Sequence, residues 1–481
     1  MNYIGIDLGT SSVKGLLIDE HLKPISKYSL DYPLLLNDEG WSEQSPEEWL
    51  DKTILVLKEL LSKSKEKIGA ISFSGQMHGL VALDSNDNIL RNAILWNDQR
   101  SFEEVNYLNN VVSKEKLIDL VGNVALTGFT LPKLLWMKDN EPDLYKSINK
   151  IMLPKDYLVY KLTGIFATDY SDASGTFMLN VEDKVWSKEL LELLNIKESI
   201  LPKLYNSYDK VSLMNKEFSN LLNVDYDIDI VVGGGDQAVG SIGTGATSQG
   251  DINISLGTSG VVFAPLNEYI KDKNGSLHNF CDATGKFHKM GVALTSAGSM
   301  KWWSDILGTI DFDEMEKLMI NIGANEPLYF LPYLIGERSP INDHKIRASF
   351  IGLSLHHKKE HMTLSIMEGV AFSIRQMYEL MEVDNEPNIM ITSGGAKSKL
   401  WVKIIANVLK SNINVIEESE GPAFGAALLA YSSYNKLNIN EISKKAVKIK
   451  ETIKPDDNIH IYQNKYEKWL KIYPSLKNLE L

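Results

Sequence analysis

Residues 7–12 read DLGTSS and residues 255–260 read SLGTSG, so one short pattern occurs early in each half of the chain. In both places a strand-like apolar stretch runs into Gly-Thr-Ser, and apolar residues resume after it. The pattern predicts a tight hairpin in which glycine lets the backbone turn. One such tripeptide carries little information, but two in equivalent settings predict two related lobes, residues 1–247 and 248–481.

A second pair of segments supports this division. Strand-like residues 228–232 lead into GGGD at 233–236, and strand-like residues 388–392 lead into SGGA at 393–396. Helix-like sequence follows both, so we predict that they are counterparts in the two lobes. Elsewhere short β-like runs alternate with longer helical ones, which is typical of an α/β fold.

Length and composition describe a globular protein of more than one domain. The chain has 481 residues, 44% of them hydrophobic and 23% charged, and its net charge is −13. An acidic balance argues against general binding to nucleic acid or to anionic membranes, although backbone amides can still bind phosphate locally. No stretch approaches the ~18 consecutive apolar residues of a membrane span, and no leader pattern opens the sequence.

The single cysteine, Cys281, cannot form an internal disulfide. This usage fits a reducing interior, and we expect a cytoplasmic protein in which Cys281 is a buried small residue rather than a reactive thiol.

Local signals predict a helix followed by two strands. Ser45 and Glu48 form a capping box around Pro46, and an apolar stripe with helical spacing follows through residues 49–61. The run 68–83 predicts two strands on either side of a polar turn at residues 75–79.

The two Gly-Thr-Ser turns are candidate phosphate sites, because such turns present N–H groups and hydroxyls to phosphate oxygens. Thr10, Ser11, Ser12 and Thr258 supply the hydroxyls, and Lys14 adds a positive charge. Either turn alone is equally well explained as an ordinary hairpin. The chain has no Gly-x-x-x-x-Gly-Lys-Ser/Thr loop and is therefore not a P-loop enzyme.

Two aspartates are candidates for the chemistry. Asp7 stands where the second turn has Ser255, and a carboxylate beside phosphates suits a hydrated Mg²⁺ ion. The alternative is an aspartate that caps its own turn. Asp236 follows three glycines at a predicted helix start, where it is either a general base for a sugar hydroxyl or a helix cap.

Two further segments carry groups suited to small ligands. Met77 and His78 lie in the polar turn, and Trp96 opens WNDQR at residues 96–100, a mixture of aromatic and polar groups that suits a polyhydroxylated ligand. Gly394 and Gly395, like the run GPAFGAA at 421–427, either admit a flat adenine ring or let helices pack closely.

Together these motifs closely resemble the FGGY family of carbohydrate kinases, over about residues 2–440. The matching segments, in order, are IDLGTSS (6–12), GQMHG (75–79), LPKDY (153–157), GGD (234–236), LGTS (256–259), GERSP (336–340), EGVAF (368–372) and GGA (394–396). The resemblance implies two ribonuclease-H-like lobes of the actin/hexokinase ATPase type, with ATP and Mg²⁺ in the central cleft.

The resemblance also implies roles for individual residues. It makes Asp236 the catalytic base and Asp7 the acidic residue of the first phosphate loop. Gly257 and Thr258 form the second phosphate loop, and Gly394 and Gly395 lie beside the adenosine.

Within the family, SGQMHG and WNDxR are most similar to the motifs of xylulokinases, in which the pair matching Met77 and His78 lines the sugar site. Glycerol kinases carry Arg-Glu at that pair. The resemblance therefore implies ATP-dependent phosphorylation of D-xylulose to D-xylulose 5-phosphate by an enzyme that is a possible homodimer. The alternatives are kinases of gluconate, ribulose or a deoxy-ketose, and an ATP-driven binding protein of the same superfamily.

Overall fold

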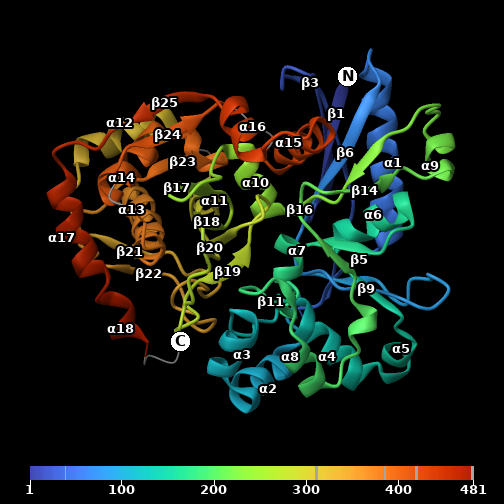
Figure 1. Cartoon of the computed structure of the whole chain (residues 1–481). Helices are drawn as coiled ribbons and strands as arrows, with labels where there is room; N and C mark the ends of the chain where they lie inside the picture. The colour runs from blue at the N-terminus through green and yellow to red at the C-terminus, as the bar shows by residue number, and fades with distance from the viewer. Residues whose placement is uncertain (38–39, 309–311, 384–385, 418–420, 478–481) are drawn as a thin grey trace.

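The computed structural model describes residues 1–37, 40–308, 312–383, 386–417 and 421–477, with the backbone alone at 312–314. Two large mixed sheets, one from each half of the chain, form the frame (Figure 1). The two-lobed α/β architecture predicted from the repeated turn is therefore confirmed.

The first sheet has the order β14-β15-β6-β1-β2-β3, and β16 pairs with β6. The strands are β1 (Asn2–Leu8), β2 (Ser12–Ile18), β3 (Pro24–Asp31), β6 (Ile68–Gly75), β14 (Lys210–Leu213), β15 (Asp229–Val231) and β16 (Gly234–Gly235). β1 and β2 form the predicted hairpin, in which Leu8 pairs with Val13. β6 runs parallel to β1 in the centre of the sheet. β7 (Val81–Leu83) follows β6 as predicted but pairs with β9 (Lys150–Met152).

The second sheet repeats this arrangement in the order β19-β20-β18-β17-β23-β24-β25. The strands are β17 (Asp251–Leu256), β18 (Gly260–Leu266), β19 (His278–Cys281), β20 (Phe287–Ala293), β23 (Asn388–Thr392), β24 (Ile413–Ile416) and β25 (Ile449–Ile453). β17 and β18 form the second hairpin, in which Leu256 pairs with Gly260, and β23 runs parallel to β17.

Sheet order corrects one sequence interpretation. β6 is the parallel neighbour of β1, and β23 is the parallel neighbour of β17, so β6 and β23 are the structural counterparts. The segment 228–232 supplies β15, which lies one strand further out and corresponds to β24. The glycine-rich ends of 228–236 and 388–396 are alike because each leaves a buried parallel strand, and they do not occupy the same place in the two lobes.

Helices cover both sheets. In the first half they are α1 (Pro46–Lys63), α2 (Phe102–Tyr107), α3 (Lys114–Val121), α4 (Thr130–Asn140), α5 (Pro142–Ser147), α6 (Pro154–Thr163), α7 (Tyr170–Ser174), α8 (Lys188–Leu194), α9 (Lys216–Leu221) and α10 (Asp236–Thr244). In the second half they are α11 (Ala297–Leu307), α12 (Phe312–Ile322), α13 (Lys359–Glu379), α14 (Lys399–Leu409), α15 (Pro422–Asn435), α16 (Ile439–Ala446), α17 (Ile459–Trp469) and α18 (Ile472–Leu476). The predicted cap of α1 is confirmed, since the Ser45 side chain accepts the N–H of Glu48.

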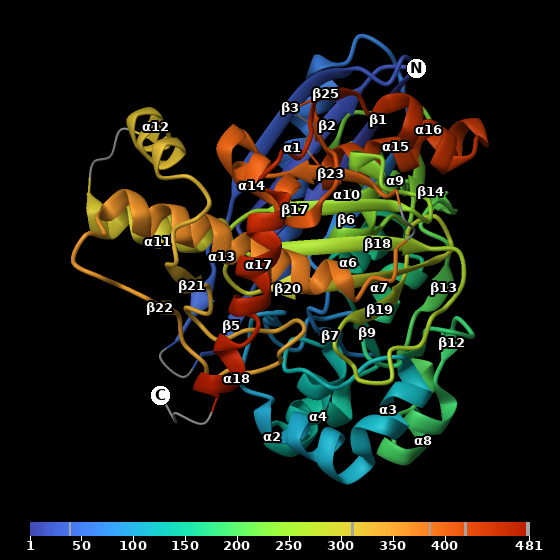
Figure 2. The same ribbon diagram turned by 90° about the vertical axis from the view of Figure 1, so that its left-hand side faces the viewer.

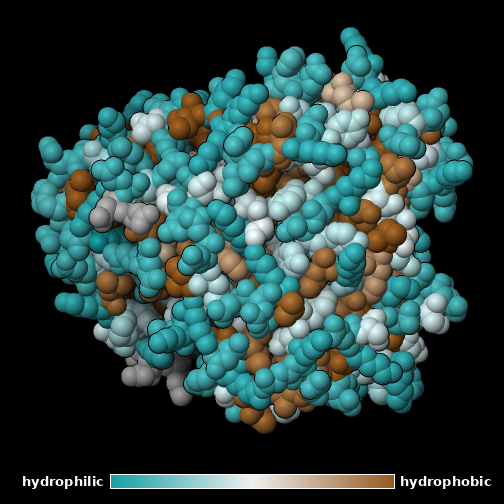
Figure 3. Space-filling view, in the orientation of Figure 1, coloured by the Kyte–Doolittle hydropathy of each residue, from teal (hydrophilic) through white to brown (hydrophobic). Residues whose placement is uncertain are grey.

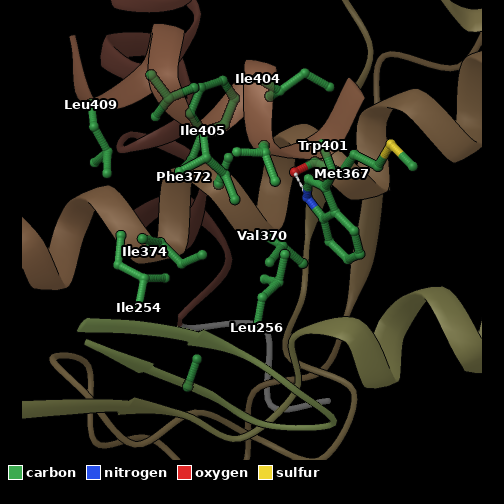
Figure 4. Close-up of a cluster of buried hydrophobic side chains, with 14 of the residues drawn as sticks. Ile254, Leu256, Met367, Val370, Phe372, Ile374, Trp401, Ile404, Ile405 and Leu409 are labelled. Carbon is green, nitrogen blue, oxygen red and sulfur yellow. Dashed lines mark hydrogen bonds between the residues drawn. The ribbon is translucent and has the colours of Figure 1, made fainter. Parts of the chain in front are cut away.

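The core of the second lobe lies between its sheet and α13 and α14. Figure 4 shows Ile254 and Leu256 of β17 below apolar side chains of the two helices. Trp401 of α14 is buried there, and its indole N–H donates to the Met367 carbonyl of α13. This pairing satisfies the polar end of a large buried ring.

A helical group closes one end of the molecule. Helices α2, α3, α4 and α8 gather there in both views (Figures 1 and 2). The group shares a core with strands of the second sheet, because Phe129 and Phe177 belong to the same buried cluster as Phe263 and Phe280. The Asn123 side-chain amide also donates to the Asn279 carbonyl at 2.8 Å and accepts the Asn279 N–H at 3.0 Å. The two halves are thus firmly joined at this end.

Two helices meet between the sheets at glycines. A Cβ on Gly243 of α10 would stand 2.2 Å from the Gly421 carbonyl oxygen, and one on Gly425 of α15 would stand 1.9 Å from that of Val239. Gly5 of β1 lets α15 approach in the same way, 2.0 Å from the Ala423 oxygen. Close helix packing, rather than room for an adenine ring, therefore explains most of the small residues in the run 421–427. Helix α15 of the second half covers the first sheet.

The mostly hydrophilic surface and the buried single cysteine are as expected from the amino-acid composition. Hydrophilic side chains cover most of the face seen in Figure 3, and hydrophobic ones are scattered over it. Among the described residues, no helix is both long and apolar enough to cross a bilayer. Cys281 is buried on β19, and burial raises the pKa of its thiol to about 12, so it stays protonated.

The glycine crossing predicts a matched pair of variants on one helix. Gly243→Ala places a methyl group into backbone atoms of α15 and should cost about 1–3 kcal/mol of stability. Gly240→Ala, one turn earlier on α10, meets only the Pro422 ring at 3.5 Å and should be neutral or slightly stabilising. Chemical denaturation compares the two, and equal losses would contradict this packing.

Candidate active site

The first Gly-Thr-Ser turn lies directly after β1. The Gly9 N–H donates to the Ser12 carbonyl at 3.0 Å and closes the turn. Ser11 is exposed at its tip, and Lys14 is exposed on β2 in register with Asp7 of β1. The exposed Ser11 at the tip, with the exposed Lys14 nearby on β2, is accessible to a ligand.

The turn is held by Gln44 and Tyr32, which the sequence interpretation did not name, and by Trp96, which it named only for the sugar. Gln44 donates to the Thr10 carbonyl at 2.6 Å, and the Trp96 indole donates to the Thr10 hydroxyl at 2.9 Å. The buried Tyr32 hydroxyl donates to the Gly9 carbonyl. These bonds come from separate strands and loops, so the conformation of the turn does not depend on its own residues alone.

The second turn is braced by the start of α11. The N–H groups of Ser296 and Gly298 donate to the Thr258 carbonyl at 2.9 and 3.1 Å, and that of Ala297 donates to Gly257 at 2.8 Å. The Thr258 side chain itself is exposed. Both turns therefore present a hydroxyl from a fixed backbone.

Gly394 and Gly395 follow β23 beside the second turn. The hydroxyls of Ser255 and Ser393 lie 2.9 Å apart and join the two segments. A Cβ on Gly395 would collide with Leu256 at 2.4 Å, whereas Gly394 has open space around it. Gly394 lines a cavity of about 800 Å³, together with Thr392, Ser393, Ala396, Lys397 and Ile416. A cavity of this size at the end of a parallel strand can hold an adenosine.

Asp236 is the first residue of α10, and the position before it, Gly235, makes no side-chain cap. Burial and the nearby Asp7 carboxylate raise the pKa of Asp236 to about 7, although groups of Gln237 bond the carboxylate and oppose the shift. Both the base and the helix-cap alternatives for Asp236 stay open, because a Gln237 backbone group in the first turn of α10 bonds its carboxylate. A carboxyl group with such a pKa can accept a proton near neutrality.

A buried charge network lies beneath the Asp236 loop. Lys155 is fully buried, and its ammonium lies 2.5 Å from Asp156, 3.0 Å from Asp169 and 3.5 Å from Asp172. Burial opposes charge on Lys155, but the three carboxylates raise its pKa. Asp169 in turn accepts the Ser171 hydroxyl, and the oxygen of that hydroxyl accepts the Gly235 N–H at 3.1 Å. The network therefore anchors the residue directly before Asp236.

Met77 and His78 are brought next to this loop. A Cβ on Gly235 would stand 2.8 Å from Met77 Cγ, so the Met77 side chain packs against the backbone before Asp236. His78 has a positive φ of 70°, and its carbonyl accepts from Thr130 at 3.1 Å and from Lys133 at 3.0 Å. Met77 therefore contacts the backbone that carries Asp236, and His78 follows Met77 in the chain.

The protonation of His78 follows from its partners. Nδ1 lies 2.8 Å from the Gly175 carbonyl, which only accepts, so Nδ1 carries the proton. Burial, together with the positive charges of Lys133 and Arg338, lowers the pKa of His78 to about 3. Nε2 is therefore an acceptor at every physiological pH.

The residues of segment 96–100 make different kinds of contact. Arg100 donates to Asp98 and to Glu43 and lies over the Trp41 ring at 4.0 Å. Asp98 and Arg100 are therefore used within the fold. Trp96 alone of these charged or aromatic residues reaches a predicted ligand-binding segment, through its bond to Thr10.

One histidine cluster outside this region resembles a metal site. Among the described residues, side-chain ligand atoms of Glu326, His356 and His357 converge within 4.8 Å. The Ser354 N–H, however, donates to His357 Nδ1 at 2.8 Å, which places the histidine proton on Nε2, facing Glu326. A metal needs that nitrogen deprotonated, so the cluster is a hydrogen-bonded one.

Family models match almost all of the chain. The N-terminal domain of the FGGY family of carbohydrate kinases matches residues 2–243, and the C-terminal domain of that family matches residues 252–434. The chain belongs to the FGGY family of carbohydrate kinases. It is accordingly a carbohydrate kinase that uses ATP as the phosphoryl donor, and the family resemblance found in the motifs is confirmed.

Known relatives cover the chain from end to end. It is 38% identical over 480 residues to a xylulose kinase of Staphylococcus xylosus, covering 98% of this chain and 99% of that protein. It is similar to ligand-bound xylulose kinase from Lactobacillus acidophilus, with a TM-score of 0.95 and 28% identity, over 99% and 98% of the two chains. Gluconate kinase from the same organism gives a TM-score of 0.94 at 27% identity, with the same coverage.

The network beneath Asp236 predicts a large and pH-dependent effect. Lys155→Met leaves three buried carboxylates without their cation and should cost about 3–5 kcal/mol. Burial already raises the pKa values of Asp156 and Asp172 in the folded state against the opposing charge of Lys155, so removing Lys155 raises them further. The loss should therefore grow as pH rises and should be greater at pH 8 than at pH 5.5.

Lys150→Met is the matched control, because Lys150 pairs with the exposed Asp87 and should cost less than about 1 kcal/mol. Apparent melting temperatures of both variants across pH test the prediction. A pH-independent loss for Lys155→Met would contradict it.

Proposed function

We propose that this kinase phosphorylates the terminal C5 hydroxyl of D-xylulose, with Asp236 as general base. The observation that carries the proposal is the packing of Met77, the chain neighbour of His78, against the backbone directly before Asp236. It joins a carboxyl group whose pKa is raised to about 7 to a neutral imidazole acceptor. The full-length similarity to xylulose kinases supports this substrate over others.

The reaction assigns one task to Asp236. As the sugar oxygen forms its bond to the γ-phosphorus, its proton passes to the Asp236 carboxylate, and the bond from that phosphorus to ADP breaks. Because Asp236 opens α10 and Gly235 is bonded through Ser171 to the buried network, the carboxylate is positioned before substrate binds.

The phosphates of ATP would lie between the two turns. Thr10, Ser11, Ser12 and the Lys14 ammonium would contact them from the first lobe, and Gly257 and Thr258 from the second. The adenosine would occupy the cavity beside Gly394 and Gly395. These assignments rest chiefly on the exposed Ser11, Lys14 and Thr258, since Ser12 is buried and Thr10 is partly buried.

Asp7 is the residue proposed to hold Mg²⁺. Burial and, after it, the charge of Asp7 raise the Asp236 pKa, and two carboxylates that interact in this way suit a hard divalent cation. When bound, Mg²⁺ would neutralise charge on the phosphates. Asp236 would then lose its proton more readily.

A substrate panel tests the proposed function. With ATP saturating, kcat/KM should be highest for D-xylulose among D-xylulose, D-ribulose, L-ribulose, gluconate and glycerol, as measured by ADP release. Water is the internal control, because ADP release without sugar should be slow when the acceptor site is empty. A tenfold preference for gluconate or glycerol would reject D-xylulose as the substrate and leave the kinase activity intact.

Asp236→Asn should fold and bind sugar but turn over about 10²–10⁴-fold more slowly, because the amide cannot accept the proton. In the native enzyme kcat/KM should fall below pH 7, since the raised pKa leaves Asp236 protonated there, and it should level off above. Steady-state rates from pH 5 to 9 test both points. A fall of less than tenfold in the variant, or an acid limb near pH 4, would contradict the role.

A further inference from the structure

Arg338 belongs to the second half of the chain, in the loop between β21 (Tyr329–Leu331) and β22 (Ser349–Ile351). The loop backbone is tied to β20, where the Ser339 N–H donates to the Val292 carbonyl at 2.9 Å. Glu337 turns back and accepts the N–H groups of Leu294 and Arg338 at 2.9 and 2.8 Å. The base of the Arg338 side chain is therefore fixed to the second sheet.

The guanidinium of Arg338 reaches the first half of the chain. Its Nη2 lies 3.7 Å from the point that a Cβ would take on Gly128, and the Trp96 carbonyl oxygen lies 2.9 Å from the same point. Arg338 also lines a small cavity between the halves with Asn123, Leu126, Leu277 and His278. His78 and His278 both contact the Phe129 ring, at 5.1 and 5.8 Å between centroids. Arg338 is thus a neighbour of the His78 end of the site.

The surroundings of Arg338 are unusual for a partly buried cation. Within the described ranges, its guanidinium has no hydrogen bond or ion pair, and Glu337, whose pKa burial raises to about 8, is the carboxyl group that opposes its charge. Arg338 contributes to lowering the pKa values of His78, Lys133 and His278. A guanidinium has five N–H donors, and those of the partly exposed Arg338 are accessible to a ligand. An acceptor-rich ligand would supply the missing partners.

We propose that Arg338 is a substrate-binding residue whose guanidinium donates to the oxygens at the ketose end of the sugar. This inference rests on the proposed function. Asp236 takes the reacting hydroxyl, Met77 packs beside it, and His78 follows. A ketopentose with its C5 hydroxyl at Asp236 therefore points its C1 hydroxyl and C2 carbonyl towards Arg338. A carbonyl oxygen only accepts hydrogen bonds, and a guanidinium only donates them.

The test compares Arg338→Ala with Arg347→Ala. Arg347 lies on the same loop, is exposed and donates only to nearby carbonyls of residues 344–346, so it controls for disturbance of the loop. With ATP saturating, kcat/KM is measured for D-xylulose and for xylitol, which has a hydroxyl in place of the carbonyl. The affinity for a non-hydrolysable ATP analogue is measured in parallel.

Arg338→Ala should lower kcat/KM for D-xylulose about 10- to 100-fold, mainly through KM, because a hydrogen bond to a charged group is lost. The loss for xylitol should be smaller, and nucleotide affinity should be unchanged. Millimolar guanidinium ion should restore part of the activity of Arg338→Ala and none in Arg347→Ala. Arg338→Lys should be intermediate, since it keeps the charge without the planar fork.

The possible failures are distinguishable. If the native enzyme phosphorylates D-xylulose and Arg338→Ala matches it, the role of Arg338 is rejected and the proposed function stands. If Arg338→Ala loses activity on gluconate but keeps it on D-xylulose, the guanidinium binds a carboxylate and the ketose assignment is rejected. If the native enzyme does not act on D-xylulose, the proposed function and this inference both fail. Loss of activity without guanidinium rescue and with weakened nucleotide binding would indicate a structural role.

Discussion

The contact of α15 with β1 at Gly5 fixes how the two halves of this kinase meet. A helix from the second half lies directly on the central strand of the first sheet, and α10 crosses it at Gly243 and Gly425. No side chain separates these backbones, so the crossing permits little adjustment. Asp236 is the first residue of α10, and Asp7 lies near the end of β1. Both carboxylates therefore belong to elements whose positions this contact fixes.

Side chains that bond to these elements extend the fixed arrangement to neighbouring parts of the candidate site. The Lys155 network reaches Gly235 through Ser171, while Trp96 and Gln44 hold the first turn through Thr10. Buried ion pairs of this kind contribute little net stability, yet losing one partner is costly. Their effect here is to hold backbone groups in fixed places, which general-base and phosphate-binding groups require.

The sequence was informative where a local pattern determines the structure. The capping box at Ser45 predicted the start of α1, and the two Gly-Thr-Ser turns predicted two hairpins and two sheets. The sequence interpretation was wrong where two similar segments, 228–236 and 388–396, were taken as structural counterparts. The strand order shows that β15 corresponds to β24 and not to β23. Burial of Lys155 among three carboxylates, and the reach of Arg338 across the halves, depend on distant contacts that no local spacing encodes.

The two ends of the proposed sugar site differ in charge, and this difference gives the sugar a direction. At one end Asp7 and Asp236 concentrate negative charge, and burial together with Asp7 raises the pKa of Asp236. At the other end Lys133 and Arg338 help to keep His78 neutral, so that its Nε2 accepts while the guanidinium donates. A hydroxyl can donate to His78, whereas a carbonyl can only accept from Arg338. A ketose bound in reverse would place its carbonyl beside two carboxylates, where only a protonated Asp236 could donate to it, and a protonated Asp236 cannot serve as the base.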